Sequence, residues 1–452
     1  MSQEQWVFIA VLITSFFGPF MGSSINLAIP YMAKEFGVLP SALTWFVSAY
    51  LLGSIAVLIP VGKLADIIGR KKVYTYGLSL FIIMTICAGL SNSLEMLIFF
   101  SFLQGIALAM IFSTGMTLLV AVNKITERGK AIGYSAAATY IGLALGPFLG
   151  GMITHFWGWR SIFGIIAIDI GLSLWAIRKV STEWYGVKEK FDLKGSVVYC
   201  LASTSLLYGC SGYTESFLGP YFLLGGILFF AIFIKMQNSI SNPILNISLF
   251  RKNLNFTMSN LAAMINYSST FAISFVLSLY LQVIRGFDAP TAGMIILIQP
   301  VLMALFSPLA GGLSDKIEPR FVATAGMILN TIGLGLLFFL TDSIDISYVA
   351  ISLVIIGLGF ALFSSPNNNA IMGSVEQKDY GVAASVLSVM RLFGQGFSIA
   401  MVNLLLSLFI KVVSNYHNAL MLGFQKIFLV FSVLSLIGVF VSVARGENKN
   451  NI

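Results

Sequence analysis

The stretch LTWFVSAYLLGSIAVLIPVGKLADIIGRKKVY, residues 43–74, carries the two features that decide the fold. Residues 43–65 are almost wholly apolar, and a helix that rises 1.5 Å per residue needs roughly 20 such residues to cross about 30 Å of hydrocarbon. The run ends in an acid, Asp66, and a basic cluster from Arg70 to Lys72, which belong at a membrane surface. The stretch therefore predicts a transmembrane helix that ends in a charged turn.

Apolar runs of this kind fill nearly all of the 452-residue chain. Hydrophobic residues make up 58% of it and charged residues 10%, which would leave a soluble globule with too little polar surface. We therefore predict an all-α polytopic membrane protein with fourteen transmembrane helices. These helices are expected near residues 7–30, 43–65, 73–91, 95–121, 130–153, 157–178, 194–213, 219–236, 254–284, 289–314, 320–341, 347–374, 382–411 and 423–444.

The basic residues test both the number of helices and their orientation. An even number of crossings places both termini on one side of the membrane. If that side is the cytoplasm, 20 of the 26 Lys and Arg residues fall in cytoplasmic segments, 5 fall outside, and Arg391 lies inside a helix. This skew is the positive-inside pattern, and an error of one helix would scramble it. We predict a plasma-membrane protein with cytoplasmic termini, and topology explains the net charge of +8 better than nucleic-acid binding does.

The second half of the sequence echoes the first. GKLAD at 62–66 resembles GGLSD at 311–315, an offset of 249 residues, and GKA at 129–131 resembles GVA at 381–383. Two six-helix halves explain both matches. We predict an N-terminal six-helix bundle (1–178), a linker with two peripheral inserted transmembrane helices (179–253), a C-terminal six-helix bundle (254–445) and a cytoplasmic tail (446–452).

The turn after the quoted helix resembles the loop motif G-x-L-A-D-x-x-G-R-[KR]-[KR] of the major facilitator superfamily. The resemblance implies a conformational latch, in which the acid pairs with nearby cations or with a helix N-terminus in only one state. Simple positive-inside anchoring is the alternative, and it explains the bases but not the glycines and the acid. That family often has Arg after the acid, where this chain has Ile67. The predicted latch residues are Gly62, Asp66, Gly69, Arg70, Lys71 and, in the second half, Asp315.

The fifth apolar run carries a glycine-rich pattern, G-x-x-x-G-P-x-x-G-G, similar to a motif of the antiporter branches of the same superfamily. Glycines four residues apart allow close helix approach, and the proline removes one backbone hydrogen bond, which bends a helix. A general packing face of the GxxxG type is the alternative. The predicted hinge residues are Gly142, Gly146, Pro147, Gly150 and Gly151.

Fourteen helices, the IPYM segment after Asn26, and FSSPNNNAIMG at 363–373 together resemble the 14-helix drug:proton antiporter family. That resemblance implies two six-helix bundles that rock about a midplane cavity and export amphipathic compounds in exchange for protons. Members commonly carry Asp where this chain has Met21 and Arg where it has Ser101. Two residues usually tied to coupling are therefore replaced, and proton antiport does not carry over intact.

Few ionisable residues fall at the middle of an apolar run, where each costs about 2.5–3.5 kcal/mol. Asp169 lies midway between Arg160 and Arg178, and we predict that it carries the coupled proton. A permanently protonated structural acid is the alternative. Arg391 is the deep cation and needs a partner, for which Asp169, the Asn cluster, backbone carbonyls or an anionic substrate are candidates. A structural role for Arg391 is as open as a substrate role.

Uncharged polar residues in the apolar runs are candidates for lining the substrate cavity. Aromatic and Met-rich surroundings suit hydrophobic ligands of varied shape, although each polar side chain alone could instead join two helices. The candidates are Asn26, Gln104, Tyr140, Asn266, Tyr267, Gln299, Asn367, Asn368, Asn369 and Gln395, together with Arg391.

The sequence lacks the patterns of residues that are typical of an enzyme active site. His155 and His417 lie near helix ends without a ligand cluster, the three cysteines lack metal-ligand spacing, and no P-loop is present. We predict a monomeric secondary transporter without cofactor or metal, whose partners are protons, the bilayer and small amphipathic substrates such as drugs. A facilitator or exporter of an endogenous metabolite or lipid is the first alternative. A non-transporting sensor or scaffold is the second, and the hinge glycines argue against it.

Overall fold

The computed structural model describes residues 2–123, 128–186, 190–213, 216–240, 243–245, 247–314, 316–375 and 380–446. Nearly all of these residues are helical, because a helix satisfies its own backbone hydrogen bonds where lipid offers none. The elements are α1 (Gln3–Phe36), η1 (Pro40–Leu43), α2 (Thr44–Ile68), α3 (Arg70–Gly89), α4 (Leu94–Val122), α5 (Arg128–Trp157), α6 (Arg160–Arg178), α7 (Leu193–Ser211), α8 (Gly219–Gln237), α9 (Ile247–Lys252), α10 (Leu254–Thr270), α11 (Ile273–Leu279), η2 (Tyr280–Ile284), α12 (Ala289–Ile296), α13 (Ile298–Ser314), α14 (Pro319–Leu337), α15 (Ile346–Gly373), α16 (Tyr380–Val412) and α17 (Tyr416–Val443).

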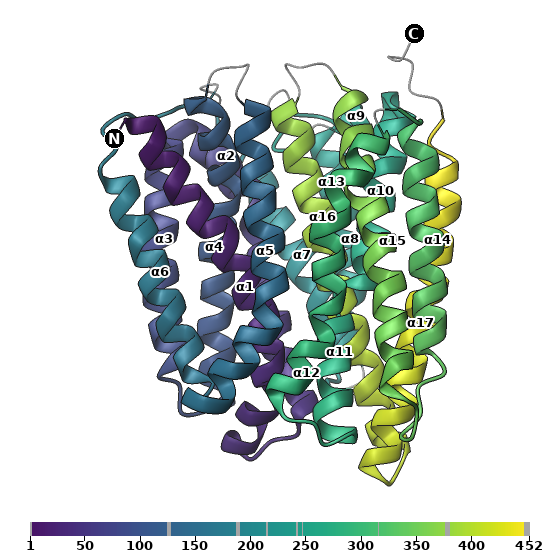
Figure 1. Cartoon of the computed structure of the whole chain (residues 1–452). Coiled ribbons are helices and arrows are strands. Elements are labelled where there is room, and N and C mark those ends of the chain that lie inside the picture. Colours follow the sequence, from purple (N-terminus) through teal and green to yellow (C-terminus); the bar gives the residue numbers. More distant parts are fainter. Residues whose placement is uncertain are drawn as a thin grey trace. The chain divides into compact units, whose positions relative to one another are not determined.

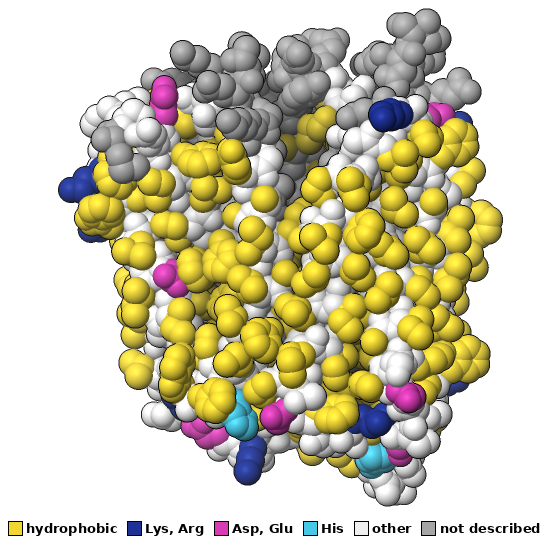
Figure 2. Space-filling model, viewed as in Figure 1, with side chains coloured by type: hydrophobic (Ala, Val, Ile, Leu, Met, Phe, Trp, Pro, Cys, Tyr) yellow, Lys and Arg dark blue, Asp and Glu magenta, His cyan; other side chains and the backbone are white. Residues whose placement is uncertain are grey.

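Thirteen helical segments of the described chain are long and apolar enough to cross a membrane. A further helix, α7, has 19 residues but is interrupted by Ser and Thr, and it completes the set of fourteen. Three of the segments are built from shorter pieces: η1 and α2 form one, α10, α11 and η2 form the second, and α12 and α13 form the third. The predicted fourteen-helix membrane fold is confirmed. Figure 2 shows hydrophobic side chains covering most of the middle of the helices, while most charged side chains lie near the helix ends and an acidic one lies at mid-height.

The chain forms two compact units, one of residues 1–209 and 220–245 and one of 210–219 and 246–452. In the first unit α1 packs on α5 and α6, α2 on α4, and α3 on α4 and α6 (Figure 1). In the second unit the corresponding pairs are α10 with α16 and α17, α13 with α15, and α14 with α15 and α17. The same set of helix pairs therefore occurs twice, as the internal sequence repeat implies.

The inserted helices α7 and α8 belong to the first unit except for the last two residues of α7 and the first residue of α8. On α7, the Tyr199 hydroxyl donates a hydrogen bond to the Ile55 carbonyl at 3.0 Å, and the Cys200 thiol donates to the Ala56 carbonyl at 2.9 Å. Both carbonyls lie on α2, so α7 is attached to the backbone of that helix. Only 17% of the residues in the most apolar stretch of α8 are buried, so most of the surface of this helix is available to lipid.

Candidate functional site

The turn between α2 and α3 brings the main latch candidates together. Gly69 separates the two helices with a φ of +116°, a conformation that side chains other than glycine rarely adopt. Across this turn Arg70 Nε donates to Asp66 Oδ1 at 2.7 Å, so the acid that ends α2 pairs with the first residue of α3. The two side chains are 34% and 22% exposed, which makes this a partly solvated ion pair.

Residues 179–186, which we call the strap, follow α6 and lie against this turn. The Glu183 carboxylate accepts hydrogen bonds from the backbone amides of Lys71 (2.7 Å) and Lys72 (3.2 Å). Those amides belong to the first turn of α3, where an anion is favoured by the unpaired donors and by the helix dipole. A Cβ at Gly69 would lie 2.6 Å from the Glu183 Cδ atom, so glycine also makes room for this carboxylate.

Backbone hydrogen bonds hold the strap in place from both directions. The Arg70 amide donates to the Trp184 carbonyl, and the Gly186 amide donates to the Asp66 carbonyl, each at 2.8 Å. Lys71 Nζ donates to the Val180 carbonyl. The α2–α3 turn is thus closed by a segment of its own unit, and Glu183 is one residue that sequence reasoning missed. Its target lies more than a hundred positions earlier in the chain, so no local pattern marks it.

The corresponding turn of the second unit lies between α13 and α14. Asp315 lies outside the described residues. Near it, Asn369 Nδ2 donates to Ser314 Oγ at 2.7 Å, and Arg320 Nη2 pairs with Glu318 Oε2 at 3.2 Å. The first of these hydrogen bonds joins α15 to the end of α13. The second is an ion pair at the start of α14.

The glycines predicted as a hinge lie on the face of α5 that touches α1. A Cβ would lie 2.2 Å from the Phe16 carbonyl oxygen if added at Gly142, and 1.8 Å from Ser23 Oγ if added at Gly146. The Ser24 hydroxyl donates to the Gly146 carbonyl at 2.9 Å. Gly150 continues the contact, and the buried Gly151 and Pro147 lie within the same helix. These residues form a face that packs closely against α1. Both the antiporter hinge motif and a general GxxxG packing face require such a contact, so it does not distinguish them.

Asp169 lies in the middle of α6 and is partly exposed. On one side of it are the buried Ile166, Ile170 and Ser173, which pack into the first unit, and on the other are exposed apolar residues such as Ile168, which is 68% exposed. Among the described residues Asp169 has no ion-pair or hydrogen-bond partner. The carboxyl therefore lies at the border between the packed and the exposed faces of α6.

The two positions that depart from the antiporter family have neutral partners. Gln104 Nε2 donates to Thr85 Oγ1 at 2.6 Å and lies 3.8 Å from the Met21 sulfur, and the Ser101 hydroxyl donates to the Phe46 carbonyl at 3.1 Å. Met21 is 3% exposed, and Ser101 and Gln104 are fully buried. The family's charged residues are thus replaced here by an uncharged contact among α1, α3 and α4.

In the second unit, Arg391 on α16 lies over an aromatic ring of α10. Its Cζ atom is 5.0 Å from the centre of the Tyr267 ring, and that ring packs edge-on against Phe360 at 5.5 Å. Arg391 and Tyr267 are both partly exposed. A guanidinium over an aromatic face is a cation–π arrangement, and it leaves the donors of Arg391 able to bind a further group.

The remaining polar residues that were predicted to line the cavity differ in how exposed their side chains are. Asn266 is fully buried, and its Oδ1 accepts from Asn330 Nδ2 at 2.9 Å, so it joins α10 to α14. Gln299 is 7% exposed and Asn367 is 1% exposed. Partly or fully exposed candidates are Asn26, Tyr140, Asn368, Asn369 and Gln395. Asn26, Gln104 and Tyr140 belong to the first unit, and the others belong to the second.

A second group that sequence reasoning missed lies at the opposite end of the first unit. Trp159 Nε1 donates to Glu35 Oε2 at 2.7 Å, and Arg160 pairs with the same carboxylate and donates to the Ser91 carbonyl at 2.8 Å. The Arg160 and Glu35 side chains are 35% and 46% exposed, so the ion pair contributes little by itself. It joins the end of α1 to the start of α6.

Comparison with known proteins agrees with this architecture. The riboflavin transporter RibZ of Clostridioides difficile (strain 630) is 31% identical to this chain over 400 residues, which cover 86% of each protein. The multidrug resistance protein Stp of Mycobacterium tuberculosis (strain CDC 1551 / Oshkosh) is 28% identical over 403 residues, covering 87% of this chain and 74% of Stp. The crystal structure of the peptide transporter POT in complex with sulfate shares the fold, with a TM-score of 0.72 and 15% identity over 98% of this chain and 95% of that chain.

A family profile described as the Major Facilitator Superfamily matches residues 11–262 and, a second time, residues 259–451. The two matches together take in nearly the whole chain. They agree with the repeated helix pairs and with the Asp66 turn motif, and the similar proteins are themselves membrane transporters. This chain belongs to the Major Facilitator Superfamily.

Proposed function

We propose that this protein is a secondary active transporter that exports amphipathic organic compounds by alternating access, in exchange for protons. Membership of the superfamily supports transport across a membrane. The resemblance to the multidrug resistance protein Stp supports export and amphipathic cargo.

The observation that carries the proposal for the cargo is the Arg391 guanidinium over the Tyr267 ring. Both side chains are partly exposed and lie well inside their membrane-spanning segments, and Phe360 adds a second ring beside Tyr267. A planar aromatic compound can pack against such rings, while a carbonyl or weakly acidic group accepts hydrogen bonds from Arg391. The preferred cargo is therefore aromatic and neutral or weakly acidic.

Asp169 is the proposed proton carrier. It is the one Asp or Glu that the described part of the first unit holds at the middle of a transmembrane helix. Its lack of a fixed partner there supports a carboxyl that gains and loses a proton as water reaches it. The neutral residues at Met21 and Ser101 leave Asp169 without the usual companions of the antiporter family.

The second candidate function is movement of an endogenous metabolite without proton antiport. Two observations favour it: the similarity to RibZ, which is named a riboflavin transporter, and the neutral contact that replaces the expected Asp and Arg. A flavin is planar and aromatic, so it would suit the same Arg391 and Tyr267 surface. The two candidates differ in energy coupling more than in the chemistry of the cargo.

Flux measurements on purified protein in liposomes test both candidates. Riboflavin and the dye Hoechst 33342 serve as cargo, with and without an imposed pH gradient. Proton exchange predicts that the gradient drives accumulation and that Asp169→Asn abolishes this drive, whereas the exposed-carboxylate control Glu4→Gln leaves it unchanged. Full gradient-driven flux in Asp169→Asn would remove Asp169 from coupling, and flux independent of the gradient in the unmodified protein would favour the second candidate.

The cargo surface is tested by conservative and disruptive changes at one position. Tyr267→Phe keeps the ring and should transport normally, whereas Tyr267→Leu loses the cation–π and stacking contacts and should weaken cargo binding by roughly tenfold. Arg391→Gln should weaken binding of weakly acidic cargo more than that of neutral cargo. Equal binding by Tyr267→Phe and Tyr267→Leu would contradict a role for this ring.

We also propose that both termini lie in the cytoplasm and that the protein acts as a monomer in the plasma membrane. The skew of 20 against 5 basic residues supports the orientation. A green fluorescent protein fused to the C-terminus should fluoresce in cells, whereas alkaline phosphatase fused there should be inactive. The reverse result would invert the topology.

A further inference from the structure

Arg445 follows α17 and is buried, although it lies where a surface anchor is expected. Its side chain is 1% exposed, and its Nε, Nη1 and Nη2 atoms have no hydrogen-bond partner in the described chain. Its Cζ atom lies 5.8 Å from the centre of the Phe363 ring, which is its aromatic contact. Burial lowers the pKa of this guanidinium to about 9, so it remains a cation at neutral pH. A buried, unpaired guanidinium is costly and calls for a partner.

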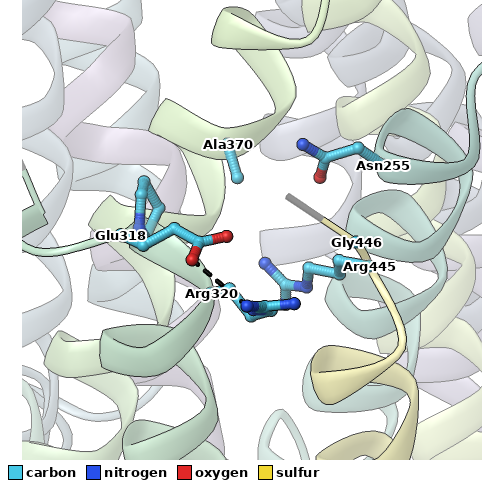
Figure 3. Close-up of a pocket in the computed structure, with 7 residues that line it drawn as sticks. Asn255, Glu318, Arg320, Ala370, Arg445 and Gly446 are labelled. Carbon is cyan, nitrogen blue, oxygen red and sulfur yellow. Dashed lines mark hydrogen bonds and ion pairs between the residues drawn. The ribbon is translucent and has the colours of Figure 1, made fainter. Parts of the chain in front are cut away.

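A narrow cavity lies beside Arg445 within the second unit (Figure 3). Asn255, Glu318, Pro319, Arg320, Ala370, Arg445 and Gly446 line it. Arg320 Nε and Glu318 Oε1 also lack partners among the described atoms, although the two residues pair with each other through Arg320 Nη2 and Glu318 Oε2. Among the described residues that line the cavity, two guanidinium groups face one carboxylate, which leaves one positive charge uncompensated within this set.

The start of α14 adds to this positive potential. The helix has 19 residues and begins at Pro319, and its N-cap residue, Glu318, makes no capping hydrogen bond with its side chain. The N-terminal end of a helix favours anions through its free backbone donors and its dipole. At the matching turn of the first unit the chain itself supplies the anion, the Glu183 carboxylate at the start of α3.

The cavity limits what can enter it. It has room for about one oxygen atom, and it is partly open to its surroundings. A water molecule offers only two acceptor positions and no charge, whereas the Arg445 guanidinium alone has five N–H donors. One oxygen of a larger oxyanion fits the space and supplies the missing charge. Guanidinium groups recognise phosphate oxygens especially well because their donors form a planar fork.

We propose that this cavity binds a phosphate group, one oxygen of which enters between Arg445 and Arg320 at the start of α14 while the rest stays outside. The phosphate is either free in solution or part of a phospholipid headgroup, since the site lies at the end of two transmembrane helices. The lining of this cavity shares no residue with the cargo surface at Arg391 and Tyr267.

The test measures thermal unfolding of the purified full-length chain in detergent while inorganic phosphate replaces chloride at constant ionic strength. Phosphate should raise the unfolding temperature of the unmodified protein. Arg445→Gln should weaken the apparent phosphate affinity by roughly tenfold or more, because it removes a charge-assisted contact. The matched control is Arg178→Gln, which changes an exposed arginine at the end of α6, the corresponding helix of the first unit, and should respond like the unmodified protein.

A second variant has the opposite expected sign and does not depend on how well Arg445→Gln folds. Glu318→Gln removes the carboxylate that competes for the same guanidinium groups, so it should strengthen phosphate binding. Loss or no change of phosphate affinity in Glu318→Gln would count against the proposed geometry.

A bilayer arm separates the two sources of phosphate. In phosphatidylcholine nanodiscs, added phosphate should have no further effect if a lipid headgroup fills the site, and native mass spectrometry should find fewer bound phospholipids on Arg445→Gln. A phosphate effect of the same size in nanodiscs as in detergent assigns the site to free phosphate. Chloride as effective as phosphate, or an equal phosphate response in the unmodified protein and Arg445→Gln, would overturn the proposal.

Discussion

The α2–α3 turn and the α13–α14 turn occupy the same place in two repeated sets of helices, but their charges are balanced differently. At the first turn Glu183 supplies a carboxylate to the start of α3, and Asp66 pairs with Arg70. At the second turn the corresponding helix start has no side-chain cap, and Arg445 is buried nearby without a hydrogen-bond partner in the described chain. The two units therefore share the arrangement of their helices but not the arrangement of charges at this turn. In the first unit a carboxylate of the chain occupies the helix start, whereas in the second unit we propose that a ligand does.

The largest expected effect comes from breaking the closed turn at Gly69. Gly69→Ala should lower the free energy of unfolding by about 2 kcal/mol or more, because a side chain is strained at a φ of +116° and would collide with Glu183. Unfolding by SDS in mixed micelles measures this change.

The matched control for Gly69 lies on α13, just before the second turn. A Cβ added at Gly312 meets nothing within 4 Å, so Gly312→Ala should change the free energy of unfolding by about 0.5 kcal/mol or less, or stabilise the helix slightly. Equal losses in the two variants would mean that contact with the strap is unimportant.

The next effect tests the carboxylate itself. Glu183→Gln keeps the size of the side chain but removes its charge, and we expect a loss of about 1 kcal/mol in the free energy of unfolding. Hydrogen exchange at the Lys71 and Lys72 amides should become faster, since both donate to this carboxylate. Unchanged exchange at these amides would show that Glu183 does not cap α3 in solution, and Glu4→Gln provides the exposed control.

A smaller effect is expected for the ion pair across the same turn. Because Asp66 and Arg70 are 34% and 22% exposed, water screens them, and Asp66→Asn should cost about 0.5 kcal/mol. A latch, unlike a simple surface pair, should change transport more than stability. A double-mutant cycle with Arg70→Gln, read out as both unfolding and flux, separates the two, and a flux change no larger than the stability change predicts would argue against a latch.

The smallest effect compares α14 with α15, which also begins in the second unit but has a side-chain cap. Hydrogen bonds from Ser347 hold the pKa of the Asp345 carboxyl below its usual value of 3.8. Because the folded-state pKa is lowered, the charged cap adds its full stability above about pH 4 and loses it as the pH falls through the lowered pKa. The stability advantage over Asp345→Asn should therefore shrink in acid, and an advantage that is constant with pH would contradict this.

Sequence patterns predicted the fold well because membrane crossing imposes strong local rules. Length, hydropathy and the distribution of basic residues indicated fourteen helices. The motif around Asp66 indicated that this acid pairs with a nearby cation, and the structure has a hydrogen bond from Arg70 to Asp66. The inserted helix α7 illustrates a limit, because Ser and Thr weaken its hydropathy even though it has the length to cross a membrane.

The site residues that sequence reasoning missed depend on contacts between distant parts of the chain. Glu183 belongs to a charged linker, and only tertiary structure shows that its carboxylate reaches the start of α3. Arg445 fits the positive-inside pattern, which predicts an exposed anchor, whereas the chain after α17 turns its side chain inward. Local patterns identify which residues are charged, but they do not show which charges the fold will enclose.

The attachment of α7 to α2 has a consequence for how an additional pair of helices can be accommodated. Pro60 has no backbone N–H, so the carbonyl of Ala56, four residues earlier, lacks its usual donor, and the Cys200 thiol takes that place. The same arrangement occurs in α1, where Pro19 leaves the Ser15 carbonyl to the Thr139 hydroxyl. The carbonyls that these prolines leave without a backbone donor therefore accept hydrogen bonds from side chains of a neighbouring helix. An added helix with a suitable donor can bind there through the main chain of its host, so the contact does not depend on the side chains of the host helix.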